Sequence, residues 1–410
     1  VGFSSSIYGT WALEYYYNAE LTSHPQPAKS LAQVIAPVSS PNTVTLTIQP
    51  ALQRIAQNAL AGRDGAVVAI NPRTGAILAM YSNPNYDPRP LTSSNGDIAT
   101  AAWKRYVKKN ANGFPPLGLL ATQQTFAPGS TFKVLTAAAG VVSRPDIFVK
   151  KYPYKPFITL PTSDKLLWNS GHSPCGGTAA EMLPGSCDPG FAQMGLDLGA
   201  DPMSSIANAF GYNQVPPIDL PGVVSSYFPD ASTFAQDLPG LAYSAIGQKD
   251  VRATALQNAL AAAGIANDGV IMTPHLMAQI TRADGSIARR FKPSRWLAPL
   301  NSLQARQLIP MMQNVTRYGT AAGVFRASDL VAAKTGTAQT GNAAENTHDW
   351  MIAFAPANNP EVAVAVVVPF QAKSDSGAAV AGPIMRCVVE GALALAKGRP
   401  ATGTPTTCPR

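Results

Sequence analysis

The stretch Phe126-Ala-Pro-Gly-Ser-Thr-Phe-Lys-Val134 runs directly into an apolar helical pattern, Leu135-Thr-Ala-Ala-Ala-Gly-Val-Val142. A proline and a glycine before Ser130 predict a tight turn, so we expect Ser130 at the start of a helix and Lys133 one turn further on, on the same face. A serine hydroxyl is a weak nucleophile unless a neighbouring base takes its proton. Lysine can be that base only when burial or another cation lowers its pKa. The plainer alternative is a helix cap followed by a solvent-facing lysine.

The composition is that of a well-packed globular protein. The 410 residues are 46% hydrophobic and 13% charged, which excludes a disordered chain and allows two or three domains. The net charge of +8 favours attraction to a negatively charged surface. Because the basic residues are scattered and no basic run is interleaved with aromatic residues, we expect no nucleic-acid partner.

The four cysteines are Cys175, Cys187, Cys387 and Cys408. They are consistent with disulfides and an oxidising compartment, although three connectivities and free buried thiols all remain open. No Cys-x-x-Cys occurs, so the cysteines predict no zinc site and no metal.

The chain divides at changes in composition. Residues 1–45 have mixed aromatic and polar character and end in a Pro/Ser-rich linker, so we expect a small non-catalytic N-terminal segment. Residues 46–398 form the main domain, and residues 399–410 are a C-terminal tail. Because the chain opens on Val1 and its first residues are too polar to span a bilayer, we expect a trimmed form whose membrane anchor is missing.

Hydrophobic periodicity gives the elements of the main domain. Strands are predicted at 43–48, 65–70, 76–81, 329–338, 349–354 and 362–368. Helices are predicted at 50–60, 251–266, 302–318 and 380–397. Strands at both ends of the chain with helices between them predict an α+β fold, in which early and late strands join one antiparallel sheet flanked by helices.

A second candidate motif is Lys334-Thr-Gly-Thr337, at the end of a predicted strand. Lys334 can pair with a carboxylate, and Thr335 can donate a hydrogen bond to it. Gly336 has no side chain, so a substrate backbone could approach the strand edge closely. A surface turn would explain the tripeptide about as well.

The two motifs, in this order and about two hundred residues apart, resemble those of penicillin-binding proteins and serine β-lactamases. Gly65-Ala-Val-Val-Ala-Ile-Asn-Pro-Arg-Thr-Gly75 looks like the first hairpin of these transpeptidase domains, and His348-Asp-Trp-Met-Ile-Ala-Phe354 looks like the strand after Lys-Thr-Gly. The opening residues are similar to those of actinobacterial PbpA-type proteins, within class B. The resemblance implies that residues 46–398 are a penicillin-binding transpeptidase domain with the transpeptidase/β-lactamase fold.

The third motif of that family is Ser-x-Asn, and here it aligns with Ser186-Cys187-Asp188. An ionised Asp only accepts hydrogen bonds, whereas Asn both donates and accepts. The departure changes the expected contact between Asp188 and the amide of a substrate. A rival triplet, Ser93-Ser94-Asn95, precedes the nucleophile and so has the wrong order.

The resemblance implies a role for each motif residue. Ser130 would be the nucleophile and Lys133 its base, kept neutral by the positive charge of Lys334. Ser186 would relay a proton to the leaving amine. The remaining contacts would be an oxyanion site made by the backbone N–H groups of Ser130 and Thr337, and a carboxylate site made by Lys334, Thr335 and Thr337 with Gly336 between them.

The family cross-links peptidoglycan stem peptides and is acylated by β-lactam antibiotics, so we expect both as partners of this chain. The resemblance further implies work in cell division or cell shape at the outer face of the cell membrane. Residues 1–45 would contact divisome or elongation proteins. No metal or organic cofactor is called for.

Three alternatives share the same motifs. A D,D-carboxypeptidase differs only in using water as the acceptor. A serine β-lactamase needs a base for deacylation, for which Glu181 is the nearest candidate. A catalytically idle scaffold of a wall-synthesis complex would use residues 1–45 for binding.

Overall fold

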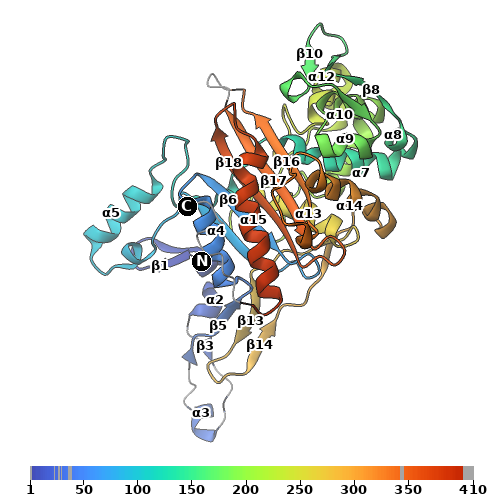
Figure 1. Cartoon of the computed structure of the whole chain (residues 1–410). Helices are drawn as coiled ribbons and strands as arrows, with labels where there is room; N and C mark the ends of the chain where they lie inside the picture. Colours follow the sequence, from blue (N-terminus) through green and yellow to red (C-terminus); the bar gives the residue numbers. More distant parts are fainter. Residues whose placement is uncertain are drawn as a thin grey trace.

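The computed structural model describes residues 2–22, 24–25, 28, 30–35, 39–341 and 346–399. A five-stranded sheet forms its centre (Figure 1), with strands in the order β16-β17-β18-β6-β7. All neighbouring strands are antiparallel. The strands are β6 (Gly65–Ile70), β7 (Ile77–Asn83), β16 (Ala332–Gln339), β17 (Thr347–Ala355) and β18 (Val362–Gln371). The predicted union of early and late strands in one antiparallel sheet is therefore confirmed, except that the strand predicted at 43–48 lies in a separate sheet.

Helices cover both faces of this sheet. On one face α15 (Gly377–Ala396) packs against β17, β18 and α4 (Pro50–Leu60), and on the other face α13 (Ala255–Ala266) packs against β6, β17 and β18. Because both faces are covered, β18 is an almost continuous run of buried apolar residues, Val362-Ala-Val-Ala-Val-Val-Val368. The sheet is thus the middle layer of the hydrophobic core.

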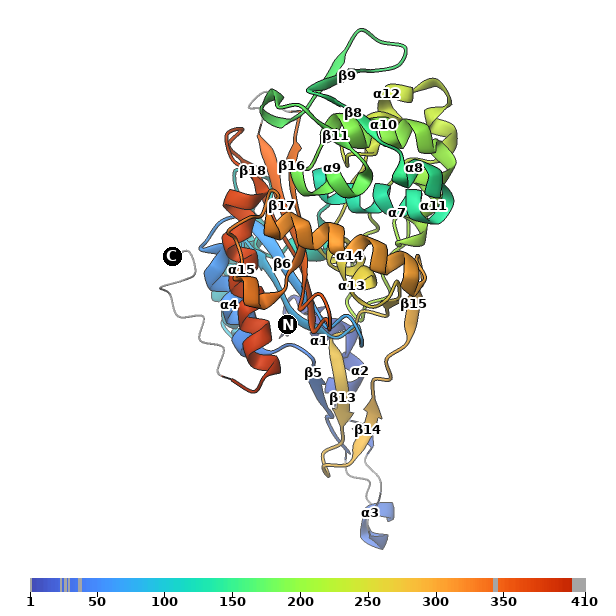
Figure 2. The same cartoon turned by 45° about the vertical axis from the view of Figure 1, so that its right-hand side comes forward.

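A helical lobe stands beside the edge strand β16 (Figure 2). Its helices are η2 (Gly129–Phe132), α7 (Lys133–Ser143), α8 (Pro145–Val149), α9 (Ala179–Gly185), α10 (Asp188–Leu198), α11 (Ala200–Ala209), η4 (Ala231–Gln236) and α12 (Leu238–Ser244). Short strand pairs rise above the lobe: β8 (Tyr152–Lys155) with β11 (Cys175–Gly177), and β9 (Phe157–Thr159) with β10 (Leu166–Trp168), followed by η3 (Ser170–His172). The helix α14 (Ser302–Arg317) lies between the lobe and β16.

The lower part of the molecule carries a second sheet, β14-β13-β5, made of β5 (Thr43–Leu46), β13 (Met277–Thr281) and β14 (Ile287–Arg290). The described elements of the N-terminal segment are β1 (Gly2–Ser5), β2 (Gly9–Ala12), α1 (Leu13–Tyr16), α2 (Asn18–Leu21), β3 (His24–Pro25), α3 (Leu31–Ile35) and β4 (Ser39–Ser40). The remaining elements are η1 (Arg89–Thr92), α5 (Gly96–Val107), α6 (Leu120–Gln123), β12 (Ile271–Met272), β15 (Arg295–Leu297) and η5 (Ala327–Asp329).

Several boundaries differ from the predicted ones for local reasons. The helix predicted from residue 251 begins at Ala255, because the side chain of Thr254 caps it by accepting from the N–H of Gln257. The strand predicted from residue 329 begins at Ala332, after the short helix η5. Of the predicted tail, only Arg399 lies within the described residues, and Cys408 lies outside them.

One helix in the described part of the chain, α15, is long and apolar enough to cross a membrane. It packs on the central sheet, where residues such as Ile384, Met385 and Val388 are fully buried. The packing therefore makes α15 a core helix of this fold.

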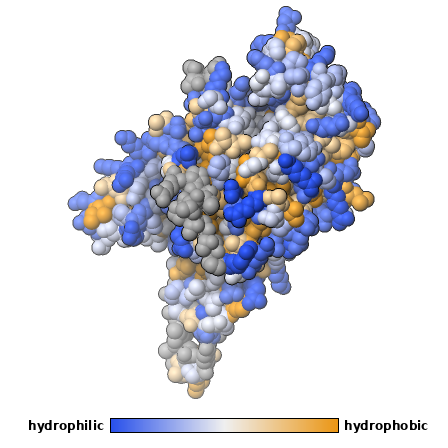
Figure 3. All heavy atoms as spheres, in the orientation of Figure 1, coloured by the Kyte–Doolittle hydropathy of each residue, from blue (hydrophilic) through white to orange (hydrophobic). Residues whose placement is uncertain are grey.

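On the face drawn in Figure 3, hydrophilic residues are spread over the surface with hydrophobic ones between them.

Part of the N-terminal segment is fixed to the main domain by a half-buried carboxylate. Tyr17 is 4% exposed, and its hydroxyl donates to Asp219 Oδ2 over 2.5 Å. The same carboxylate accepts the backbone N–H groups of Leu276 and Met277, next to and within β13. Burial, with the Asp219 carboxylate beside it, raises the pKa of the Tyr17 hydroxyl. Asp219 thus joins α1 to the lower sheet.

Removing the Tyr17 hydroxyl tests this anchor. Tyr17→Phe deletes a hydrogen bond to a charged group inside the protein, so we expect unfolding in urea to require about 2 kcal/mol less free energy. Tyr15→Phe is the matched control, because Tyr15 is 61% exposed. Equal urea midpoints for the wild type and Tyr17→Phe would show that the Asp219 contact adds nothing to stability.

Candidate active site

The turn that carries Ser130 is held from two sides. Ser130 lies in the 3-10 helix η2, and α7 begins at Lys133, so the predicted helix start is a tighter turn than expected. The N–H of Gly129 donates to the carbonyl of Gly247. The indole Nε1 of Trp350, on β17, donates to the carbonyl of Ala127 over 2.9 Å. Ser130 is half-buried at the junction between the lobe and the sheet.

Lys133 is fully buried, so the solvent-facing alternative is wrong. Its Nζ donates to the Ser186 carbonyl over 2.6 Å and to Asp188 Oδ1 over 2.5 Å. A longer contact of 3.3 Å reaches the Ser186 hydroxyl. Within the described residues, no hydrogen bond joins Lys133 to the Ser130 hydroxyl. Catalytic contacts often tighten only when substrate is bound, so the shared helical face remains the basis for pairing the two.

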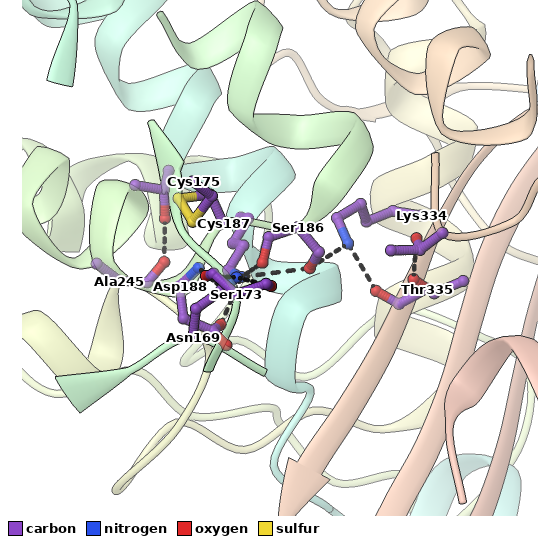
Figure 4. A network of polar contacts seen from close by, with 12 residues as sticks. Asn169, Ser173, Cys175, Ser186, Cys187, Asp188, Ala245, Lys334 and Thr335 are labelled. Carbon is purple, nitrogen blue, oxygen red and sulfur yellow. Dashed lines mark hydrogen bonds and ion pairs between the residues drawn. A yellow bond between two sulfur atoms is a disulfide. The ribbon is translucent and has the colours of Figure 1, made fainter. Parts of the chain in front are cut away.

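The Ser186 hydroxyl contacts two buried amines. Its Oγ accepts from Lys334 Nζ over 2.8 Å (Figure 4), and Lys133 Nζ lies 3.3 Å from the same oxygen. Ser186 ends α9 with a left-handed backbone (φ 58°, ψ 42°), which turns the chain so that its hydroxyl meets both lysines. The three motifs, from three distant stretches of sequence, therefore meet at one hydroxyl group.

The carboxylate of Asp188 contacts the first motif. Asp188 is the first residue of α10, and its carboxylate forms an ion pair with Lys133. Its backbone N–H donates to Asn169 Oδ1. The residue between Ser186 and Asp188 is Cys187, whose disulfide to Cys175 joins this turn to β11. The aspartate is thus arranged to act on the base Lys133.

Burial lowers the pKa of both lysines. For Lys133 burial is the main cause, and the Asp188 carboxylate opposes it. The pKa of Lys334 lies well below its usual value, because of burial first and the charge of Lys133 second, with Asp188 again opposing. Repulsion between two amines is mutual, so a positive charge on either lysine disfavours protonation of the other. Amines with lowered pKa values can hold the neutral form that a base requires.

The Lys334-Thr-Gly-Thr337 segment runs along β16 at the edge of the sheet. The Thr335 hydroxyl shares a 2.6 Å hydrogen bond with the hydroxyl of Thr320, which follows α14. Thr337 Oγ1 accepts from the N–H of Gly377, the first residue of α15. A Cβ at Gly336 would lie 2.8 Å from the Pro128 carbonyl, so the glycine makes room for the nucleophile turn. Its role in substrate approach stays a prediction.

Several supporting residues were missed at the sequence level. Asn169, Thr320, Gly247 and Gly377 each hold one motif through a single hydrogen bond. Each comes from a distant segment, and none has a local pattern that could have singled it out. The described residues hold no group of three or more His, Cys, Asp or Glu side chains that could bind a metal ion.

The fold and the three motifs define a serine acyltransferase of the penicillin-binding class, and comparison with known proteins agrees. Residues 65–390 match the family model of the penicillin binding protein transpeptidase domain. The chain belongs to this family, as a class B penicillin-binding protein of the PbpA type.

Named relatives and solved structures support this assignment. The chain is 38% identical over 368 residues to peptidoglycan D,D-transpeptidase PbpA of Mycobacterium tuberculosis, covering 85% of this chain and 72% of that protein. It is 38% identical over 370 residues to PbpA of Mycolicibacterium smegmatis, with the same coverage. The crystal structure of PBPA from M. tuberculosis superposes with a TM-score of 0.85 at 34% identity, covering 96% of this chain and 91% of that one. A penicillin G acyl-enzyme complex of penicillin-binding protein A from M. tuberculosis also gives 0.85 at 34% identity, covering 95% and 90%.

Asp188 should set the pH at which Lys133 loses its proton. In Asp188→Asn the carboxylate that favours the charged amine is gone, so Lys133 should be neutral at lower pH. The acid limb of the rate of acylation by penicillin should then move down by about one pH unit. The measurement is the second-order acylation rate across pH, with folding checked by circular dichroism.

Asp201→Asn is the matched control for this experiment, because Asp201 is an exposed aspartate in the first turn of α11. Its profile should overlay that of the wild type. An unmoved acid limb in Asp188→Asn would contradict a role for the carboxylate in setting the protonation of Lys133.

Proposed function

We propose that this chain is a peptidoglycan D,D-transpeptidase that works through an acyl-serine at Ser130. The single observation that carries the mechanism is the Ser186 hydroxyl, held between the buried amines of Lys133 and Lys334 next to the nucleophile turn. A hydroxyl so placed can pass a proton between two groups whose pKa values are lowered. Family membership supplies the substrate class, the D-Ala-D-Ala end of a stem peptide.

In the first step, the Ser130 oxygen attacks the carbonyl carbon of the donor peptide while neutral Lys133 takes the hydroxyl proton. The carbonyl oxygen becomes an oxyanion, which the backbone N–H groups of Ser130 and Thr337 stabilise by about 3 kcal/mol per donor. The C–N bond then breaks. The leaving D-Ala amine receives a proton through Ser186, which leaves an ester at Ser130.

In the second step, an amine of another stem peptide attacks this ester. Its proton returns through the same lysine and serine groups to the Ser130 oxygen, so a new amide forms and the enzyme is restored. The acyl group therefore moves from one amine to another with no net change in proton count.

The terminal carboxylate of the donor would bind along β16. Lys334 supplies positive charge, and Thr335 and Thr337 supply hydroxyl groups. The Thr337 hydroxyl accepts from Gly377, so its own proton stays available to donate to a carboxylate. A β-lactam offers a carboxylate and a reactive carbonyl together, so penicillins would acylate Ser130 in the same place.

The setting of the protein follows from this function. Its relatives are cell-wall enzymes, and a disulfide beside the active site fits an oxidising, extracytoplasmic compartment. We place residues 46–398 as the transpeptidase domain and residues 1–45 as a segment for contact with divisome or elongation proteins. We also propose that a membrane anchor precedes Val1 and that residues 399–410 form a C-terminal tail.

Other acceptors lead to other activities. A β-lactamase needs a base to activate water, but the candidate Glu181 is exposed and its carboxylate accepts from the backbone and hydroxyl of Thr178 in a helix cap. It is therefore occupied as a capping residue. A D,D-carboxypeptidase would share every residue of the site and differ only in taking water as the acceptor.

Labelling with a fluorescent penicillin tests the assignment of the nucleophile. Ser130→Ala should lose all covalent label, because no other oxygen takes its place. Lys133→Ala should keep the serine but acylate about 10² to 10⁴ times more slowly, as expected for loss of a general base. The measurements are gel fluorescence and intact mass over time.

Ser143→Ala is the control, because Ser143 is an exposed serine at the far end of α7. It should label as fast as the wild type. Covalent label that persists in Ser130→Ala would contradict the assignment, and rapid release of label from the wild type would favour a β-lactamase.

A further inference from the structure

A carboxylate is buried on the face of the central sheet opposite the two lysines. Asp349 on β17 lies directly across from Thr337 on β16 and from Val368 on β18. Residues directly opposed in a sheet share a face, and this is the face covered by α15. Asp349 is 0% exposed, in a strand that is otherwise largely apolar. A buried acidic residue in such a strand is costly and needs a physical reason.

The first turn of α15 lies against the motif strand at this point. The N–H of Gly377 donates to Thr337 Oγ1 over 3.0 Å. A Cβ at Gly377 would lie 2.3 Å from the carbonyl oxygens of both Gly336 and Trp350, so the backbone of α15 rests directly on β16 and β17. The position of Thr337 therefore depends on how closely the start of α15 packs against these two strands.

Asp349 is only partly satisfied in this place. Its Oδ1 accepts from the Thr347 hydroxyl over 3.3 Å. Its Oδ2 is buried and has no hydrogen-bond partner in the described part of the chain. A neutral carboxyl group tolerates such surroundings, whereas an ionised one with an unpaired oxygen does not.

We propose that Asp349 is a positioning residue for acylation of Ser130: its neutral form keeps β16 packed on the first turn of α15, and its ionised form loosens that packing. The inference rests on the function proposed above. Besides Thr347, two donors belong to this part of the sheet: the hydroxyl of Thr337, which lies opposite Asp349, and the N–H of Gly377, which contacts Thr337. Drawing on either one displaces Thr337, whose N–H and hydroxyl serve the oxyanion and the carboxylate.

The charged groups around Asp349 set where this change occurs. Burial raises the pKa of Asp349 to about 7, the Thr347 hydrogen bond lowers it, and the Asp375 carboxylate raises it. Lys373 and Asp375 are the titratable groups in the segment that leads into α15. His348 and Lys334 lie on the opposite face of their strands, and burial lowers the pKa of His348 to about 4.

The raised pKa of Asp349 determines how the acylation rate changes with pH. The neutral carboxyl, and the packing that depends on it, is fully present below the ordinary Asp pKa of about 4. It is lost as pH rises through about 7. In the wild type, this contribution to acylation should therefore decline between about pH 6 and pH 8.

The test compares second-order acylation rates by a fluorescent penicillin from pH 6 to pH 8.5, in the whole chain. Asp349→Asn keeps the shape of the side chain but cannot ionise. The ratio of its rate to the wild-type rate should be close to 1 at pH 6 and about tenfold at pH 8, where only about one-tenth of a group with this pKa is neutral.

Two further variants sharpen the test. Asp375→Asn removes a charge that raises the pKa of Asp349. The decline in acylation rate should therefore begin at lower pH in this variant than in the wild type. Asp97→Asn makes the same chemical change at an exposed position in α5, away from the sheet (Figure 1), and should follow the wild type.

A rate ratio for Asp349→Asn that stays constant across this pH range would overturn the inference while leaving the proposed function intact. If Asp349→Asn does not fold, as judged by circular dichroism, Asp375→Asn decides alone, and an unshifted decline overturns the inference. A wild-type chain that takes no label at Ser130 at any pH would contradict the proposed function, and the inference with it.

Discussion

The structure depends on the burial of one amine, that of Lys133. A fully buried lysine is costly in its charged form, and the chain offsets this cost by directing a carbonyl, a hydroxyl and a carboxylate at it. Two effects therefore oppose each other at Nζ. Burial favours the neutral base that Ser130 requires, and Asp188 favours the charged form. Burial is the larger effect, so the pKa of Lys133 is lowered, and burial likewise lowers the pKa of the neighbouring Lys334.

The motif strand β16 has contacts on three sides that fix its position. The nucleophile turn fits against Gly336, Thr320 holds the hydroxyl of Thr335, and the first turn of α15 holds that of Thr337. A shift in any of these contacts would move the lysine and the threonines together, because they lie on one strand. The interactions that build the sheet are thus the same ones that place the catalytic groups, and this is why a buried group such as Asp349 could act on the site from the far face.

Much of this arrangement could be predicted from the sequence. Apolar periodicity gave the strands of the central sheet, and the order of two short motifs led to the family. The contacts of Asp188 and Asn169 could not be predicted, because they depend on the direction that the chain takes in the turn after α9. The left-handed backbone of Ser186 and the disulfide of Cys187 set that direction. Neither has a signature in the local pattern, and the pairing of Cys175 with Cys187 was one of several connectivities left open.

Lys133 can act as the base because its pKa is lowered. The most direct measurement is an NMR titration of the chain with ¹³C-labelled lysine Cε carbons, in which the Lys133 resonance is assigned by its absence in Lys133→Met. This resonance should titrate clearly below the ordinary lysine pKa of about 10.4. Titration at or above that value would contradict the role of Lys133 as the base, because a lysine that stays charged cannot take the proton of Ser130.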